Sequence, residues 1–234
     1  MRILLGLAKP QAGTVRVLGH AVQGGDKEVR RIVGYAPEGE ALFPGLTGAE
    51  SVAYAGRLSG MPAADAIQRT HQVLDYVGLG EVRYRPATTY SAGMRQRLKL
   101  AQALVQDPEA LILDEPTEAV DPEARKDLLA LVRDLSHTHG IPILFSTHLL
   151  SDAEAVADTV VVLDRGQVAA QGTLSSLKTV AAGGFIVRAH AGLDLLQAGL
   201  QTAGFQCEFR QAELIVRGAQ PADILYHAER ANAV

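Results

Sequence analysis

The strongest constraint on the fold is a strand, helix, strand pattern in the middle of the chain. Residues 110–114 (ALILD) and 141–147 (IPILFST) are short apolar runs bounded by turn residues, as expected of buried strands. Between them, leucine and valine recur at helical spacing, with Pro122 near the start and Gly140 at the end. A helix that joins two such strands is the crossover of a parallel sheet. The sequence therefore predicts an α/β fold with a largely parallel sheet.

Other segments extend this α/β architecture. We expect the two runs to be central strands and residues 159–164 (TVVVLD) to be a further buried strand, followed by a hairpin-like piece. Helical pieces broken by SGMP (59–62) and GLG (78–80) predict a helical subdomain over about 45–105. Residues 185–234 follow the order strand, helix, strand, strand, helix. We interpret them as a small α+β appendage to a larger domain over residues 1–180.

The N-terminal stretch MRILLGLAKPQAGTVRVLG superficially resembles a secretion signal. Its uninterrupted apolar run, residues 3–8, is shorter than the roughly 7–15 residues of a signal peptide core, and no clean cleavage site follows. Pro10 and Gly13 end this run, and residues 14–19 alternate like a half-buried strand. We therefore expect a helix end that turns into a strand.

Composition narrows the class of protein. The chain has 234 residues, a formal net charge of −4 and a single cysteine, so an internal disulfide is excluded. An acidic balance without a basic stripe gives no reason to expect nucleic acid as a partner. No apolar run approaches the roughly 18 residues that span a bilayer, so we expect any membrane role to depend on a partner.

Residues 90–104 (YSAGMRQRLKLAQAL) contain the first candidate site. Ser91 is a plausible N-cap of an amphipathic helix, and Gly93 would let the backbone approach a ligand closely. Free N–H groups and the helix dipole make such an end suitable for an anion. Capped amphipathic helices are common in α/β proteins, so this segment alone does not decide between a phosphate site and a structural cap.

Two strand ends carry the other candidates. Asp114 and Glu115 end one apolar run, and His148 follows another. Ligands of α/β sheets bind at the carboxyl ends of the strands, where one acid can hold Mg²⁺ and another can orient a water for attack on phosphorus. An imidazole could contact a phosphate or that water. Each feature alone also suits a solvated turn or a structural histidine.

The order of these motifs resembles that of the ATP-binding subunits of ABC transporters. YSAGMRQR is similar to their signature motif, LILDEP to the Walker B strand, EAVD to the D-loop and STH to the H-loop. The resemblance runs from residue 1 to about 178 and implies a P-loop NTPase-like fold. The YS-x-GM-x-QR form and the C-terminal appendage most resemble the ATPases of ABC-2 type exporters.

The resemblance implies roles for the residues around the sheet, with ATP and Mg²⁺ as cofactors. Asp114 would support Mg²⁺, Glu115 would polarise the hydrolytic water and His148 would sense the γ-phosphate. Residues 33–51 fall where the family has its Q-loop, which touches Mg²⁺. Glu38 stands there in place of the usual glutamine, which keeps an oxygen ligand and adds charge.

It also implies partners. Ser91 and Gly93, together with Gln96, would bind the ATP held by a second ATPase subunit, and Asp121 would couple the two subunits. Glu118-Ala119-Val120 replaces the more common small-Gly-Leu sequence of the D-loop. An ABC-2 type transmembrane permease would hold the protein at the cytoplasmic face of the membrane. The transported substance would be chosen by that permease.

One motif of the family is missing from this sequence. A P-loop, G-x-x-x-x-G-K-[ST], cradles phosphates with backbone N–H groups and a lysine, yet the dipeptide Gly-Lys does not occur. Residues 3–19 match the family's helix end and strand after that loop. We therefore expect a chain shortened at its N-terminus, with weak or no ATP binding of its own. The alternatives are a non-catalytic partner that completes the ATP site of an intact subunit, and a soluble ABC ATPase without a transporter.

Overall fold

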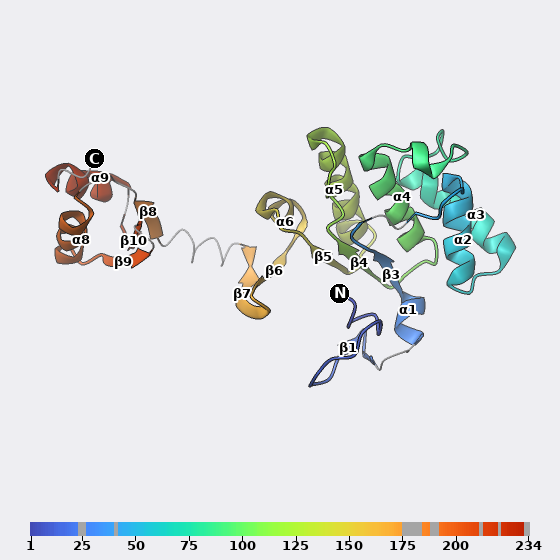
Figure 1. Ribbon diagram of the computed structural model, residues 1–234, viewed down its shortest axis with the longest axis horizontal. Coiled ribbons are helices and arrows are strands. Elements are labelled where there is room, and N and C mark those ends of the chain that lie inside the picture. Colours follow the sequence, from blue (N-terminus) through green and yellow to red (C-terminus); the bar gives the residue numbers. More distant parts are fainter. Residues whose placement is uncertain are drawn as a thin grey trace. The chain divides into compact units, whose positions relative to one another are not determined.

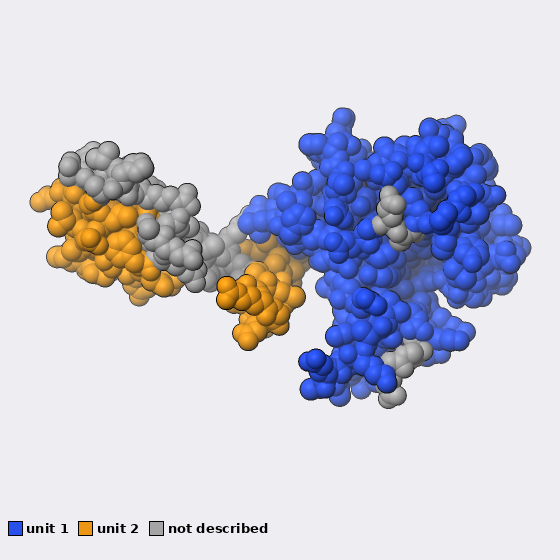
Figure 2. Space-filling model, in the orientation of Figure 1, with its two compact units in different colours: residues 1–157 blue, residues 158–234 orange. Residues whose placement is uncertain are grey.

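The computed structural model of the protein describes residues 1–22, 27–39, 42–174, 184–187, 192–210, 213–219 and 221–231. The chain divides into two compact units, Met1–Ala157 and Asp158–Val234, coloured separately in Figure 2. The first unit contains, in order, β1 (Arg16–Val17), β2 (His20–Ala21), α1 (Glu28–Ile32), β3 (Val33–Ala36), α2 (Gly48–Leu58), α3 (Ala63–Tyr76), the 3₁₀ helix η1 (Ala87–Thr89), α4 (Ala92–Leu104), β4 (Ala110–Asp114), α5 (Pro122–His137), β5 (Ile143–Ser146) and α6 (Leu150–Val156).

A parallel sheet in the order β3-β4-β5 forms the centre of this unit (Figure 1). Strand β4 is in the middle, and its Leu111, Ile112 and Leu113 are buried. Helix α5 is the crossover from β4 to β5, which confirms the α/β prediction. Strand β5, however, lies at an edge of the described sheet with Leu144 45% exposed, so the expectation of a second central strand was wrong.

Helices α2, α3 and α4 pack together in the main hydrophobic cluster, and α4 packs against β3. Thr47 caps α2 in a capping box with Glu50, in which each side chain bonds the other residue's backbone N–H. The two predicted breaks are present: α2 ends at Leu58, and Gly78 follows α3 with a φ of 74°. A left-handed backbone of this kind suits glycine, which explains why the helix ends there.

The N-terminal residues differ from the expectation. Residues 2–6 form turns, with Leu4 N–H bonding the carbonyl of Met1 at 2.9 Å, and no α-helix occurs there. The predicted strand is reduced to β1, which pairs only with β2 in a short antiparallel hairpin. Leu5 is nevertheless buried in a small cluster with Val29, so hydrophobic packing rather than helix formation holds this segment.

The second unit contains β6 (Thr159–Asp164), β7 (Gln167–Thr173), β8 (Gly184–Val187), α8 (Leu193–Thr202), β9 (Gln206–Arg210), β10 (Glu213–Arg217) and α9 (Pro221–Arg230). Strands β6 and β7 form an antiparallel hairpin, as expected. The prediction that TVVVLD is buried was wrong, because Val161 and Leu163 are 54% and 68% exposed. A hairpin of two strands does not by itself bury the apolar side chains on its two faces.

Among its described residues, the rest of this unit is a sheet in the order β8-β10-β9 with helices α8 and α9. Leu196 and Leu200 of α8 pack against Leu214 and Val216 of β10 in a separate hydrophobic cluster. The element order from residue 184 onward is the predicted one. The predicted domain limits at 180 and 185 stay predictions, since the compact units divide at 157 and 158. No helix among the described residues is long and apolar enough to cross a membrane.

Candidate functional site

The carboxyl edge of the parallel sheet gathers four of the predicted site residues. Glu38 follows β3, Asp114 and Glu115 come at the end of β4, and His148 follows β5. Because the three strands are parallel and adjacent, their ends meet at one edge. The topology therefore brings together side chains that are far apart in the sequence.

Glu115 and His148 are directly paired. The Nδ1 atom of His148 lies 2.9 Å from Oε2 of Glu115. The Glu115 side chain is 18% exposed and that of His148 is 66% exposed, so the pair is open to solvent on the histidine side. A carboxylate held in this way can accept a proton from a water, and the exposed imidazole can meet an incoming phosphate.

The backbone of Glu115 is strained and held from β5. Its φ is 46°, in the left-handed region that a residue with a side chain seldom adopts. Its N–H donates to the carbonyl oxygen of Ser146 at 3.2 Å and lies 3.1 Å from the Ser146 hydroxyl. These contacts fix the direction in which the carboxylate leaves the strand. Strain of this kind is often found at functional sites.

Asp114 is fixed by the same serine. The Ser146 hydroxyl donates to Oδ1 of Asp114 at 2.5 Å. On the other neighbouring strand, Tyr35 has a raised pKa because of its burial and, next, because of the charge of Asp114. A charged Asp114 disfavours loss of the tyrosine proton, so the phenol stays a hydrogen-bond donor beside it. Asp114 thus lies on β4 next to Tyr35 of β3 and accepts a hydrogen bond from Ser146 of β5.

Helix α4 begins at Ser91, as predicted. The Ser91 hydroxyl accepts a bond from the Met94 N–H at 3.3 Å, so Ser91 is the N-cap. Gly93 is buried, and a Cβ atom there would lie 2.9 Å from the Cβ of Ala124. In this chain the glycine therefore permits close packing of α4 on α5. Ser91 and Gly93 remain a predicted ligand site for a second subunit, and their observed contacts are within the chain.

The turn between β4 and α5 is anchored on both sides. Gln96 donates from Nε2 to the carbonyl of Glu118 at 3.3 Å. Ala119 has a φ of 57°, in the left-handed region. Asp121 caps α5 by accepting a bond from the Ala124 N–H at 3.0 Å. The predicted D-loop is therefore a hydrogen-bonded turn that leads directly into the crossover helix.

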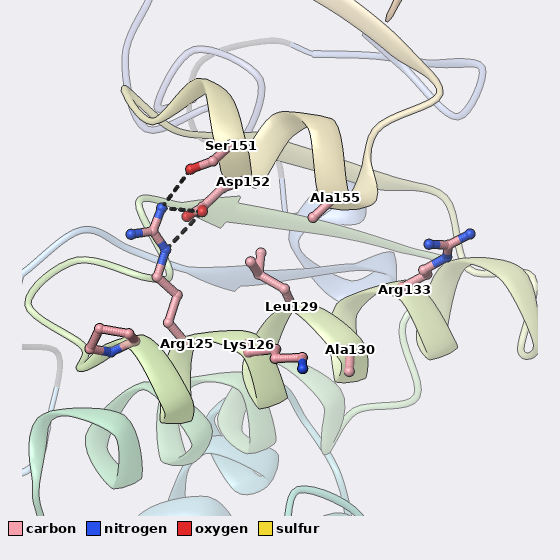
Figure 3. A pocket seen from close by; sticks show the side chains of 9 residues that line it. Arg125, Lys126, Leu129, Ala130, Arg133, Ser151, Asp152 and Ala155 are labelled. Carbon is pink, nitrogen blue, oxygen red and sulfur yellow. Dashed lines mark hydrogen bonds and ion pairs between the residues drawn. The ribbon is translucent and has the colours of Figure 1, made fainter.

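Sequence reasoning missed a buried ionic network beneath this turn. Asp152 of α6 is 1% exposed and accepts a bond from the Thr117 hydroxyl at 2.6 Å. Its other oxygen, Oδ1, accepts a hydrogen bond from Nε of Arg125 at 2.7 Å. The same oxygen also accepts a bond from Nη2 of that guanidinium. Figure 3 shows Arg125 reaching from α5 to Asp152 and Ser151 on α6. Nothing in the sequence distinguished Asp152 from a solvent-exposed acid in the first turn of a helix.

A groove of about 410 Å³ runs beside this network between α5 and α6 (Figure 3). It contains none of the predicted site residues and is lined by Pro122, Arg125, Lys126, Leu129, Ala130, Arg133, Ser151, Asp152 and Ala155. The chemistry of the site therefore lies at the sheet edge rather than in this groove.

The residues at the sheet edge fit a magnesium ion that is shared with phosphate. Asp114 and Glu38 offer carboxylate oxygens, the ligand type that Mg²⁺ prefers. Among the described residues, no group of three or more histidine, cysteine, aspartate or glutamate side chains could hold a metal alone. Mg²⁺ commonly keeps waters and binds through one or two carboxylates plus nucleotide phosphates. The donor set is thus suited to a metal that arrives with a nucleotide.

Comparisons with known proteins agree with this arrangement of a P-loop NTPase-like sheet. The profile of the family described as "ABC transporter" matches residues 1–118. The uncharacterized ABC transporter ATP-binding protein YxlF of Bacillus subtilis (strain 168) is 40% identical over 178 residues, which are 76% of this chain and 58% of that protein. The daunorubicin/doxorubicin resistance ATP-binding protein DrrA of Streptomyces peucetius is 40% identical over 179 residues, 76% of this chain and 54% of that protein.

Solved structures give the same result. A structure of the ATP binding subunit of an ABC transporter superimposes with a TM-score of 0.66 at 30% identity, and the match covers 77% of this chain and 75% of that one. The chain belongs to the ABC transporter family. It spans just over half the length of these two curated relatives.

Proposed function

We propose that this chain is the ATP-binding and ATP-hydrolysing part of an ABC transporter. The observation that carries the proposal is the Glu115–His148 pair beside Asp114 at the carboxyl edge of a parallel sheet. Oε2 of Glu115 and Nδ1 of His148 lie 2.9 Å apart. Family membership supports it, because the family profile covers residues 1–118, which include Glu38, Asp114 and Glu115. ATP and Mg²⁺ are the proposed cofactors.

The proposed chemistry assigns each residue a separate task. Asp114 and Glu38 hold Mg²⁺, which offsets the charge of the phosphates when it is bound. Glu115 orients a water and accepts its proton as the water oxygen attacks the γ-phosphorus, and the bond to the bridging oxygen breaks. His148 fixes the Glu115 carboxylate and presents its exposed ring to the γ-phosphate. ADP and inorganic phosphate are the products.

We also propose the partners that this chemistry requires. Ser91, Gly93 and Gln96 contact ATP in a second ATPase subunit, and Asp121 couples the two sites. The subunits act on an ABC-2 type transmembrane permease and so work at the cytoplasmic face of the membrane. Export is the proposed direction, and the similarity to a daunorubicin/doxorubicin resistance protein supports it.

Replacement of Glu115 by glutamine tests the proposal. The protein is made from the whole reading frame of its gene, so that any codons in frame before Met1 are included. We expect Glu115→Gln to lower Mg²⁺-dependent ATP turnover by about a thousandfold, because the amide cannot accept the proton. The control is Glu123→Gln, an exposed acid in the first turn of α5, with turnover unchanged. Equal turnover in both variants would contradict the proposed role of Glu115.

A second function is favoured by one observation, the start of α4, where the Ser91 residue that caps the helix is exposed. In this alternative the chain is a non-catalytic partner whose α4 completes the ATP site of an intact subunit. The purified chain would then neither bind nor hydrolyse ATP but would raise the turnover of that subunit. Stimulation that Ser91→Glu abolishes would favour this alternative over the first.

A further inference from the structure

A buried lysine connects helix α4 to the loop that carries Glu38. Lys99 is only 4% exposed although it is a charged residue. Its Nζ atom donates to the carbonyl oxygens of Pro37 at 2.8 Å and Gly39 at 3.0 Å. Glu38 is the residue between these two acceptors. The ammonium group therefore holds the backbone on both sides of the proposed magnesium ligand.

The charges around Lys99 come from the proposed site. Burial lowers the pKa of Lys99, whereas the negative charges of Glu118, Asp114 and Glu38 act in the opposite direction. A buried ammonium is costly, and a well-packed apolar side chain often gives equal or greater stability. A contribution to stability alone is thus a weak explanation for a lysine here, and its bonds to the Glu38 loop give a specific one.

Helix α4 also contacts the other loop beside Asp114. Gly93 packs on Ala124, and Gln96 bonds the carbonyl of Glu118 on the turn after β4. Together with Lys99, these residues are spaced three apart, so they follow one another along a ridge of the helix. The ridge touches the turn after β4 at one end and the loop after β3 at the other. Helix α4 therefore contacts both loops that flank Asp114.

We propose that Lys99 is a positioning residue that sets the place of Glu38 relative to Asp114 and couples it to α4. The inference rests on the proposed function, in which Glu38 is a metal ligand. Ser91, at the start of α4, is the proposed contact to the nucleotide of the second subunit. Lys99 lies about 12 Å further along the same helix axis. Binding at the start of α4 is thereby transmitted to the metal-side loop of this chain's own site.

Amide hydrogen exchange of the purified chain tests the link without any need for ATPase activity. Lys99→Met removes the N–H donors and keeps the apolar stem. We expect exchange at the loop-side amides of β3, which pairs with β4, to rise about tenfold, because the two charge-assisted bonds that hold the adjoining loop are lost. The matched control is Leu98→Ala, which makes a cavity on the same helix at a fully buried position. The control should raise exchange throughout the first unit without favouring these amides of β3.

Two outcomes overturn the inference: unchanged exchange at these amides in folded Lys99→Met, or the same pattern in both variants. If Lys99→Met does not fold, Lys99→Gln, which keeps an amide donor on a shorter stem, is compared with Leu98→Ala in the same way.

A kinetic measurement on the protein from the whole reading frame separates positioning from a general structural effect. We expect Lys99→Met to raise the Mg²⁺ concentration for half-maximal turnover about tenfold while kcat at saturating Mg²⁺ changes less than about twofold. A fall in kcat alone would contradict the proposed link to Glu38. A wild-type protein without turnover would contradict the proposed function, and the exchange experiment would still decide whether Lys99 positions the loop.

Discussion

The two units of the chain bury different kinds of side chain. Within the described residues, the buried polar or charged side chains all lie in the first unit, and they are Ser51, Thr70, Lys99, Thr117 and Asp152. The main core of the second unit is built from apolar residues such as Leu196, Leu200, Leu214 and Val216. Burying a polar group costs free energy unless the group is hydrogen-bonded. Stability alone therefore does not explain an interior that keeps several of them.

The location of these polar residues shows what the difference means. Thr117 and Asp152 anchor the turn after β4, and Lys99 holds the loop after β3. Both are loops at the sheet edge where Asp114 and Glu115 lie. Lys99, Thr117 and Asp152 therefore fix loops of the first unit, whereas the apolar interior of the second unit holds its sheet and helices together.

The largest expected effect is in the second unit. Leu214→Ala removes a fully buried side chain from β10, and we expect the free energy of unfolding of this unit to fall by about 4 kcal/mol. Urea unfolding followed by NMR signals assigned to each unit measures it. The control, Leu225→Ala, alters a residue that is 65% exposed and should change stability by less than about 0.5 kcal/mol. If the signals of the first unit were lost at the same lowered urea concentration, the conclusion that the two units have separate interiors would be contradicted.

A smaller effect is expected from the buried acid of the first unit. Asp152→Ala leaves the Arg125 guanidinium, which is 25% exposed, without its carboxylate, and we expect a loss of about 3 kcal/mol in that unit alone. The same urea titration applies. Asp127→Ala is the control, because Asp127 forms an ion pair with Arg97 but is 62% exposed and should contribute less than about 1 kcal/mol. Equal losses for both aspartates would show that burial does not distinguish them.

The smallest effect concerns the start of α4. Ser91→Ala removes the N-cap acceptor, and we expect the first unit to lose about 1 kcal/mol. Ser91→Asp is the matched variant, since it restores an acceptor and places a negative charge at the positive end of the helix. Stability that stays low in Ser91→Asp would contradict a capping role. This result sharpens the comparison by measuring an exposed polar contact beside the buried ones.

The fold was predictable where local pattern and pairing agree. ALILD at 110–114 and TVVVLD at 159–164 are similar apolar runs, yet the first is a buried central strand and the second is half of an exposed hairpin. Periodicity reports how apolar a strand is, whereas burial depends on how many strands and helices come to cover it. The helix end predicted for the short N-terminal apolar run was wrong for the same reason. Leu5 is buried there, although the segment is not helical.

The candidate site was predictable from the order of its motifs. The residues that hold the site residues in place were not predictable. Asp114, Glu115 and His148 each follow an apolar run, a position that marks a sheet edge in an α/β protein. Ser146, which contacts both acids, was visible only as a neighbour of His148. Lys99 and Asp152 look like ordinary charged residues of amphipathic helices. Only the folded chain shows that their carboxylate or ammonium groups are buried.

The backbone of Glu115 also concerns protein design. At a φ of 46° a glycine or asparagine would fit with less strain, and the left-handed region costs an ordinary residue about 1 kcal/mol or more. A designer who optimised a sequence on this backbone for stability alone would choose one of those residues at position 115. The designed protein would keep the sheet and lose the carboxylate. Position 115 is therefore one at which inverse folding should be constrained by hand.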